Sequence, residues 1–260
     1  MGNADKNRIQ WNDEETLACG LTLKPIRMEH YTEWMRCKRA LTLRQSTLPA
    51  VYAVMPYLSA LFAMDMTYQT SFIHETMLLL ALATGKKPEQ FAAYAHTDEP
   101  TKLAFIRLED EGQDVDIFPK DYPAIREILA KQNGERLPDE GENPELVEAE
   151  QDILAARRGE LDWNINTMLA SVAYQYRMRK NDLRKWSISE FEEAREAIDR
   201  DKNHLILGLA ERMPMVKFTH GNPVPSWCLN RRQDGNAAIE KMSDFMNRTG
   251  VGGSALPIQG

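Results

Sequence analysis

The sequence of 260 residues has few of the residues that build cross-linked or metal-bound folds. It contains three cysteines, Cys19, Cys37 and Cys228, which are far apart and form no Cys-x-x-Cys pair. Such spacing predicts reduced thiols, with neither a disulfide framework nor a zinc site. The five histidines form no HxH, HxxxH or HExxH motif, so no zinc-binding helix is predicted either. We therefore expect no bound metal.

The motifs of nucleotide-binding and hydrolytic enzymes are also missing. The chain has no GxxxxGK, GxGxxG or GxSxG sequence, so no phosphate loop and no nucleophile elbow is predicted. Carboxylates are dense between Glu109 and Asp116, but they surround a turn that water should reach. Acid–base catalysis needs a carboxyl group whose pKa is shifted by its surroundings, and an open turn provides no such shift. We expect no enzymatic activity and no cofactor.

Charge and hydropathy place the chain among ordinary globular proteins. Hydrophobic residues make up 43% of the chain and charged residues 27%, a composition that favours a packed core. The net charge of −7 argues against general binding to nucleic acid or to an anionic membrane. The first residues lack the apolar stretch of a signal peptide, and the run Leu78–Leu82 is too short to span a bilayer. These features predict a cytoplasmic protein.

Apolar spacing at i, i+3 and i+4 predicts helices over most of the chain. Pro56 either kinks the apolar stretch Val51–Met66 or begins a new helix in it. Pro88–Pro100 is predicted to be a short helix and a loop. Seven other helices are expected. The first begins near Met28, and the others are Ser71–Thr84, Lys120 to a stop at Gly134, Pro144–Arg158, Trp163 to about Trp186, Ser187 or Ser189 to Pro214, and Ala237–Phe245. The helix that ends at Pro214 has a predicted capping box at Ser189 and Glu192.

Strand signals are few and short. Leu17–Leu23 reads as a strand, and Leu103–Leu108 and Val115–Phe118 read as a hairpin around Gly112. Met215–His220 is a further candidate. The predicted fold is therefore mainly α with a small β element (α+β): a helical bundle with a short N-terminal strand and a central hairpin. We predict a flexible N-terminus (1–16), an N-terminal helical region with the hairpin (17–134), an acidic linker (135–143), a C-terminal helical region (144–248) and a flexible tail (249–260).

Apolar and methionine-rich helices are the first candidate for a binding surface. Methionine side chains repack easily, so they suit a surface that meets different apolar partners. The same side chains could instead form the core of this chain or close an oligomer of it. The candidate partner-binding residues are Tyr52, Met55, Tyr57, Leu61, Phe62, Met64, Met66 and Met77.

A basic cluster near Trp186 is the second candidate. One hypothesis makes it the basic helix of a helix-turn-helix regulator of DNA. Another pairs it with the acidic residues of 135–152, within one chain or between copies. Because the rest of the chain is acidic, we expect weak or no binding of nucleic acid. The cluster consists of Arg177, Arg179, Lys180, Arg184 and Lys185.

Four stretches taken in order carry a resemblance to a known family. They are LTLKPIRMEHYTEW, MPYLSALFAM, DIFPKDYPAIREILAKQNGERLPDEGENPELVEAE and SISEFEEAREAI. In this order, over about residues 17–215, the chain resembles the tail assembly chaperones of long-tailed phages and prophages, especially those of Gram-positive bacteria. The matching motifs consist of apolar spacing and turn residues rather than an invariant chemical group.

The resemblance implies a non-enzymatic protein of virion assembly in the bacterial cytoplasm. Such a chaperone binds apolar helical segments of the tape measure protein, keeps that protein soluble and recruits tail tube subunits. We also expect a homo-oligomer and no membrane partner. Two alternatives stay open at this point: a structural tail or neck component of the particle, and the helix-turn-helix regulator.

Overall fold

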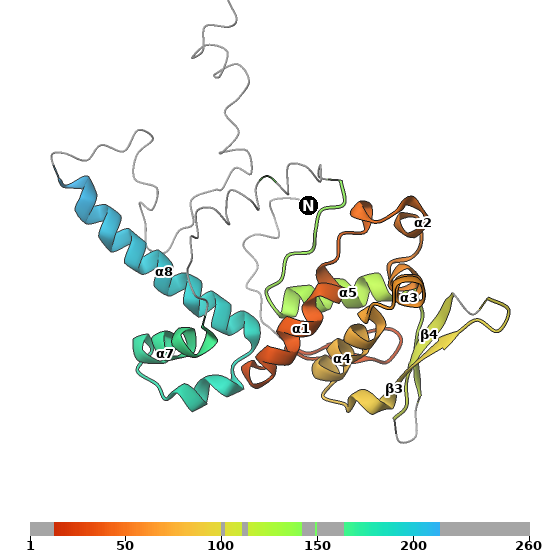
Figure 1. The fold of residues 1–260 in the computed structure, drawn as a ribbon. Helices are drawn as coiled ribbons and strands as arrows, with labels where there is room; N and C mark the ends of the chain where they lie inside the picture. Colours follow the sequence, from red (N-terminus) through yellow and green to blue (C-terminus); the bar gives the residue numbers. More distant parts are fainter. Residues whose placement is uncertain (1–12, 100–101, 111–113, 142–148, 150–163, 214–260) are drawn as a thin grey trace, which may run out of the picture. The chain divides into compact units, whose positions relative to one another are not determined.

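The computed structural model describes residues 13–99, 102–110, 114–141, 149 and 164–213 (Figure 1). It confirms the predicted mainly α fold with a small β element. The chain divides into two compact units, 1–195 and 196–260, and each is described by itself. The helices expected at Pro144–Arg158 and Ala237–Phe245 and the strand expected at Met215–His220 lie outside the described residues, apart from Ala149, which is helical.

The N-terminal helices follow the predicted spacing. Pro56 immediately precedes a new helix and does not kink a continuous one, because proline's fixed φ and missing N–H suit a helix start. Gly85 ends the most apolar helix with φ of 69°, a conformation that glycine adopts without strain. The elements are the 3-10 turn η2 (Met28–His30), α1 (Tyr31–Thr42), η3 (Gln45–Thr47), α2 (Ala50–Ala53), α3 (Tyr57–Tyr68) and α4 (Phe72–Thr84).

Helix α4 forms the centre of the core, because it packs against both α1 and α3. Leu79 and Leu80 of α4 are fully buried, as are Trp34 of α1 and Leu61 of α3. Burying such a side chain stabilises the fold by roughly 1.5–3 kcal/mol. The all-round apolar sequence of α4 is thus explained by neighbours on more than one side.

A three-stranded antiparallel sheet packs beside these helices. It consists of β3 (Phe91–Ala95), β4 (Leu103–Leu108) and β5 (Val115–Ile117) in the order β3-β4-β5. Ile106 and Ile117 are paired across the strands and are fully buried. The predicted hairpin of β4 and β5 is therefore confirmed.

Strand β3 was not predicted. The expectation of a short helix and a loop over Pro88–Pro100 is wrong except for the 3-10 turn η4 (Pro88–Gln90). Three alanines among five residues give a weak strand signal, since alanine is depleted in strands. The strand forms because Phe91 is buried opposite Leu108 of β4, a contact distant in sequence.

The single strand expected at Leu17–Leu23 is a small hairpin. Its strands are β1 (Glu15–Thr16) and β2 (Thr22–Leu23), and they pair antiparallel. Gly20 lies in the connecting turn with φ of 88°. A chain reversal at this glycine replaces the continuous strand, because Leu17 N–H closes the turn on the Leu21 carbonyl at 2.9 Å.

The acidic stretch after α5 (Tyr122–Gln132) binds back onto the α1–α2 connection. The Glu140 carboxylate accepts hydrogen bonds from the N–H groups of Gln45 at 3.0 Å and Ser46 at 2.8 Å. Lys38 pairs with Glu135 at 2.8 Å. Residues 135–141 therefore form a strap across the connection, and part of the predicted linker has a structural role.

The helix expected from Trp163 to about Trp186 is shorter than predicted. Helix α7 (Ile165–Gln175) begins with a hydrogen bond from Asn166 N–H to the Asn164 side chain at 2.9 Å. The chain then turns at Arg177, where φ is 52°, and enters the 3-10 helix η5 (Lys180–Lys185). The turn brings Trp186 edge-on to Tyr176, with 5.5 Å between ring centroids.

The long helix α8 (Ile188–Glu211) begins directly after Ser187, the first of the two predicted starts, but its capping box differs from the predicted one. The box is formed by Ser187 and Glu190 instead of Ser189 and Glu192. Ser187 N–H donates to the Glu190 carboxylate at 2.6 Å, and Glu190 N–H donates to the Ser187 hydroxyl at 3.2 Å. This start is fixed because Ile188 N–H also donates to the Ile26 carbonyl at 2.9 Å.

The strap gives a prediction about pH. Burial alone would raise the pKa of Glu140, but hydrogen bonds from Ser46 and Gln45 outweigh it and lower the pKa below its ordinary value of 4.5. A carboxyl with a lowered folded pKa stabilises the fold above the unfolded pKa and loses that effect as the pH falls through the folded pKa. Glu140→Gln should therefore lower the free energy of unfolding at pH 7, by about 1 kcal/mol or less since the side chain is exposed.

Urea unfolding at pH 7 and at pH 3 measures this effect. The difference between wild type and Glu140→Gln should shrink toward zero at pH 3. Glu127→Gln is the matched control, because Glu127 is exposed on α5 and should show no difference at either pH. An equal loss of stability at both pH values would contradict the role of the carboxylate.

Candidate functional site

The eight predicted partner-binding residues fall into three groups by exposure. Tyr52, Tyr57 and Leu61 are buried within this chain, so their side chains offer little surface to a partner. Met66 is 55% exposed. The remaining four, Met55, Phe62, Met64 and Met77, are half-buried.

Tyr57 holds α3 against the end of α1. Its hydroxyl donates to the Ala40 carbonyl at 2.8 Å. Its ring stacks on Tyr122 of α5 with 6.0 Å between centroids, and the Arg126 guanidinium lies 3.8 Å from the ring centroid. Burial raises the pKa of Tyr57 well above its ordinary value, so the hydroxyl stays protonated and remains a donor. These contacts explain Tyr57 as a structural residue.

Exposed apolar side chains occur on α2, on the residue that follows it and at the end of α3. Four of them are exposed by more than half: Val51 by 64%, Val54 by 84%, Met66 by 55% and Tyr68 by 57%. We call these four residues the α2–α3 surface. Solitary exposed apolar residues are normal, but a group of them within one short stretch of chain marks a candidate interaction surface.

A small cluster of its own supports this surface from below. Tyr52 packs with Ala60 and Ala63. The Tyr52 ring meets Tyr68 edge-on at 6.1 Å, and its hydroxyl donates to the Thr67 hydroxyl at 3.2 Å. Because Tyr52 belongs to α2 and contacts Thr67 and Tyr68 of α3, it fixes α2 relative to α3. The partly buried side chains packed against the cluster are Leu48, Met55 and Met64.

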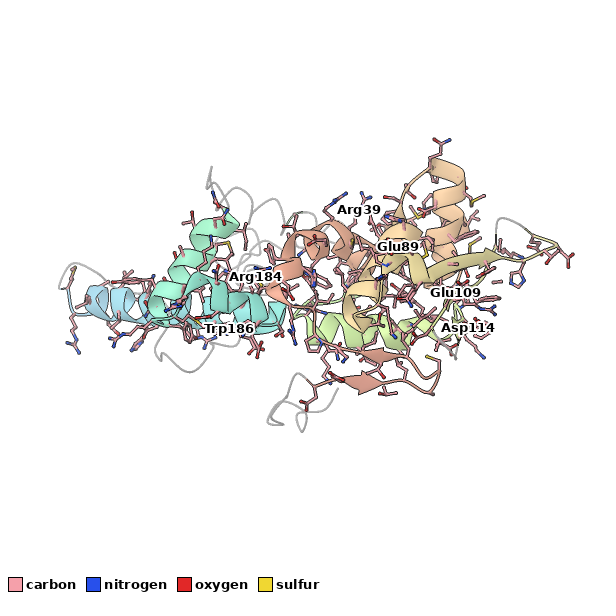
Figure 2. The ribbon with its side chains drawn as sticks, turned by 90° about the horizontal axis from the view of Figure 1, so that it is seen from below. Arg39, Glu89, Glu109, Asp114, Arg184 and Trp186 are labelled. Atoms are coloured by element: carbon pink, nitrogen blue, oxygen red, sulfur yellow. The ribbon has the colours of Figure 1, made fainter. Side chains whose placement is uncertain are left out.

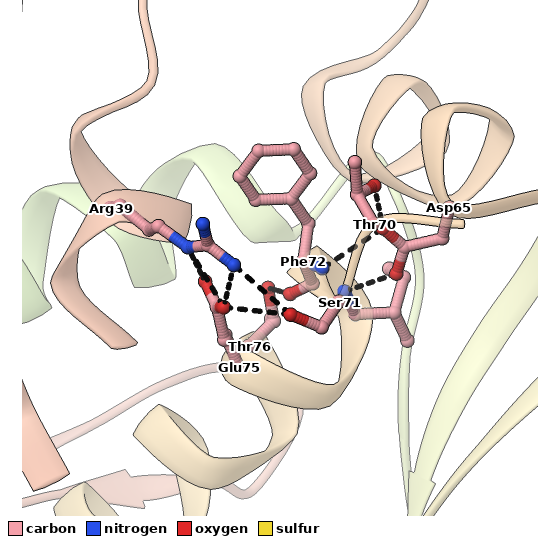
Figure 3. A network of polar contacts seen from close by, with 8 residues as sticks. Arg39, Asp65, Thr70, Ser71, Phe72, Glu75 and Thr76 are labelled. Carbon is pink, nitrogen blue, oxygen red and sulfur yellow. Dashed lines mark hydrogen bonds and ion pairs between the residues drawn. The ribbon is translucent and has the colours of Figure 1, made fainter. Parts of the chain in front are cut away.

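The connection between α3 and α4 is fixed by a polar network (Figure 3). Asp65 accepts hydrogen bonds from the N–H groups of Phe72 at 2.9 Å and Ile73 at 2.7 Å. These two donors lie at the start of α4, where the helix itself supplies no acceptor. Arg39 of α1 pairs with the buried Glu75 of α4, and its Nε lies 2.8 Å from the carboxylate. Each polar group satisfies a helix end or a neighbouring helix, so we interpret the network as structural.

The basic cluster does not lie on an α-helix. Arg177 and Arg179 are in the turn after α7, and Lys180, Arg184 and Lys185 are in η5; Figure 2 shows Arg184 and Trp186 on this segment. All five side chains are exposed. The prediction of a basic helix at 177–185 is therefore wrong, and the helix-turn-helix hypothesis loses the element that it placed in a DNA groove.

Two of the five cations have partners in the structure. The Lys180 ammonium donates to the Asn166 side chain at 2.7 Å, and Arg184 lies 3.7 Å from the Glu29 carboxylate. Both contacts join η5 to neighbouring elements of the same unit. They give these cations a role in holding the turn, whereas residues 142–148 and 150–152 of the acidic partner stretch that the sequence suggested lie outside the described residues.

Another group of exposed apolar side chains lies on α8 in the second unit. The sequence predicts this helix but not the exposure of its apolar face. Leu205 and Leu209 of α8 and Met213 just after it are spaced by four residues, and Ile206 lies beside them. Their exposed fractions are between 56% and 63%. Spacing of this kind indicates a continuous stripe along one side of the helix.

A cleft of about 480 Å³ lies next to β2 and the start of α8. Its lining mixes acids with bases, including Lys24, Arg27, Glu29 and Glu190. The Ser187 hydroxyl in its wall is engaged in capping α8. No group of His, Cys, Asp or Glu suited to a metal occurs among the described residues. Within the same residues, no helix combines the length and the apolar character needed to cross a membrane.

Comparisons of the chain with protein-family models, with curated proteins and with solved structures find no match. Function is therefore inferred from the surfaces described above, together with the resemblance in sequence.

The placement of Tyr57 gives a second prediction. Tyr57→Phe removes a buried hydroxyl and leaves the Ala40 carbonyl without this donor, so we expect a loss of about 1–2 kcal/mol in the free energy of unfolding. Chemical denaturation measures the loss. Tyr174→Phe is the control, because Tyr174 is 84% exposed and its change should stay within about 0.5 kcal/mol. A Tyr57→Phe protein with unchanged stability would show that this hydroxyl is dispensable.

Proposed function

We propose that this protein is a non-enzymatic tail assembly chaperone that works in the cytoplasm of a bacterial host. It holds apolar helical segments of a tape measure protein and helps to recruit tail tube subunits. The observation that carries the proposal is the α2–α3 surface, where Val51, Val54, Met66 and Tyr68 are each more than half exposed. The ordered resemblance of four sequence stretches supplies the identity of the partners.

The chemistry of the α2–α3 surface suits a helical apolar partner. Covering apolar area removes it from water and stabilises the complex by about 25 cal/mol per Å². Among the described residues, Val54 and Tyr174 have the highest exposed fraction of the large hydrophobic side chains, and Val54 lies within the charge-free stretch Ala50–Met64. Methionine at positions 55, 64 and 66 allows the surface to repack around side chains of different shape. A long partner with many apolar turns requires such tolerance.

The helices beneath the surface are held by contacts to their neighbours, while its four outer side chains are exposed. Tyr52 fixes α2 on α3, and Asp65 fixes the end of α3 on α4. A binding surface on a fixed base loses less conformational entropy when it binds than one that must first become ordered. The strap of residues 135–141 adds to this base, because Glu140 fixes the connection that leads into α2.

The test uses a synthetic helical peptide with one apolar stripe, whose binding is followed by fluorescence anisotropy. Val54→Asp with Met66→Asp places two charges in the α2–α3 surface and should weaken binding at least about tenfold, which corresponds to about 1.4 kcal/mol. Met35→Asp is the matched control, since Met35 is 43% exposed on α1 outside this surface. Circular dichroism should show the wild-type helix content for both proteins.

Three outcomes would contradict the proposal or part of it. Equal binding by the double variant and the Met35→Asp control would remove the α2–α3 surface. Loss of binding only in Leu205→Asp with Leu209→Asp would move the site to α8. Recovery of the protein from purified phage particles would favour a structural tail or neck component, because a chaperone leaves before the particle is complete.

A further inference from the structure

Strand β3 is an open edge of the sheet. It lies at one end of the order β3-β4-β5, and its sequence Phe91–Ala95 (FAAYA) has no charged residue and no proline. Proteins usually protect an edge strand with lysine, proline or a bulge, because its free N–H and C=O groups can pair with another chain. The one irregularity in the β3–β4 ladder places the extra residue, Ala104, on β4, so the outer edge of β3 stays regular.

The backbone groups that point away from β4 can be assigned from the ladder. The Gln90 carbonyl accepts from Glu109 N–H at 2.8 Å, and His96 N–H donates to the Lys102 carbonyl at 2.9 Å. Even-numbered residues of this stretch therefore face β4, and the alternation of an antiparallel ladder directs Ala93 and Ala95 outward. Among the described residues, no backbone hydrogen bond outside the sheet involves Ala93 or Ala95.

We propose that β3 pairs antiparallel with β3 of a second copy of this chain, about a two-fold axis at Ala93. The N–H and C=O of Ala93 would then exchange hydrogen bonds with the same groups of the other copy. Ala95 N–H would donate to the Phe91 carbonyl across the axis on each side. A two-fold axis makes such an interface self-complementary, which is the commonest arrangement in homodimers.

Side-chain size along β3 fits this register. Pairing about Ala93 places Phe91 opposite Ala95 and Tyr94 opposite Ala92, so each large ring meets a methyl group. The rings therefore do not collide: Phe91 is already buried in its own unit, and the exposed part of Tyr94 meets only the small Ala92 of the other copy. Tyr94 is 37% exposed and stacks on Phe105 of β4 at 5.0 Å, so its ring is already held on the outer face of the sheet.

Charge also fits this register. Antiparallel pairing brings the stretch before β3 of one copy beside the stretch after β3 of the other, so Lys87 approaches Asp98 and Glu99. All three side chains are exposed. Neither Lys87 nor Asp98 forms an ion pair with another described residue, whereas Glu99 pairs with Lys102. Complementary charges at both ends favour antiparallel over parallel pairing of the two copies.

The second copy fits better than an unrelated extended segment. Another strand would have to supply small residues opposite Phe91 and Tyr94 and an acidic group opposite Lys87, and the chain's own strand supplies all of these. The β3–β4 hairpin also extends beyond the helices (Figure 1), and residues 94–99 at its tip are exposed. This end of the β3–β4 hairpin is therefore open to a second copy of the chain.

Amide hydrogen exchange followed by NMR tests the pairing within the intact chain. In a monomer, Ala93 N–H faces water and exchanges fast, whereas Ala92 N–H is bonded to β4 and exchanges slowly. Dimer formation should slow exchange at Ala93 as the protein concentration rises and should leave Ala92 unchanged. Ala92 is thus an internal control. Exchange at Ala93 that does not depend on concentration would overturn the proposal.

Sedimentation velocity of designed variants gives an independent test. Ala93→Pro removes only an outward N–H, which an edge strand tolerates, and should shift the dimer to monomer by at least about tenfold in Kd with an unchanged circular dichroism spectrum. Lys87→Glu should weaken the dimer in the same direction, and Lys87→Glu with Asp98→Lys should restore it. If Ala93→Pro does not fold, this charge exchange still decides the result.

The inference does not depend on the proposed function. A dimer that persists in folded Ala93→Pro, or the absence of any dimer in wild type, would overturn it. Loss of the dimer in Val54→Asp with Met66→Asp, together with its persistence in Ala93→Pro, would assign self-association to the α2–α3 surface. Peptide binding by the chaperone surface should be the same in Ala93→Pro as in wild type.

Discussion

Two buried amide side chains at the end of α5 hold together three distant parts of the first unit. The Asn133 side chain accepts from Ile26 N–H at 3.0 Å and donates to the Leu129 carbonyl at 2.8 Å. Gln132 beside it donates to the Leu23 carbonyl at 3.2 Å. The extended segment held in this way passes along Trp186–Ile188 and fixes the start of α8. A buried amide that lost one partner would cost about 1–3 kcal/mol, so these contacts strongly favour one arrangement.

The exposed surfaces follow from what this arrangement covers. Apolar α4 lies at the centre of the core. Helices α1 and α3 pack on it, and leucine side chains of all three helices are buried there. Helix α2 has only four residues and contacts the rest mainly through Tyr52, so Val51 and Val54 are left outside. Strand β3 is left with an open edge for a similar reason, because the sheet ends there. Among the described residues, both candidate surfaces are places where no further helix or strand packs on the core.

Sequence patterns predicted long elements well and contacts between distant segments poorly. Helices α1, α3, α4 and α5 were predicted because their apolar spacing is local and Gly85 and Gly134 end two of them. Strand β3 was missed because it depends on Phe91 meeting β4. Among the eight candidate partner-binding residues, only Met66 is mainly exposed, since periodicity shows that a face is apolar and does not show what covers it.

The two surfaces of the first unit differ in the kind of partner that each can select. Pairing along β3 uses backbone hydrogen bonds at a fixed spacing, and a slip by one residue would turn every side chain to the opposite face of the sheet. Such an interface requires one constant partner, and a second copy of the chain meets that requirement. The α2–α3 surface has methionine and valine side chains without a fixed register, so it can contact successive turns of an apolar helix with similar affinity. The proposed chaperone would use the two surfaces for two different partners, because the fold places them on separate elements: β3 for one, and α2 with the end of α3 for the other.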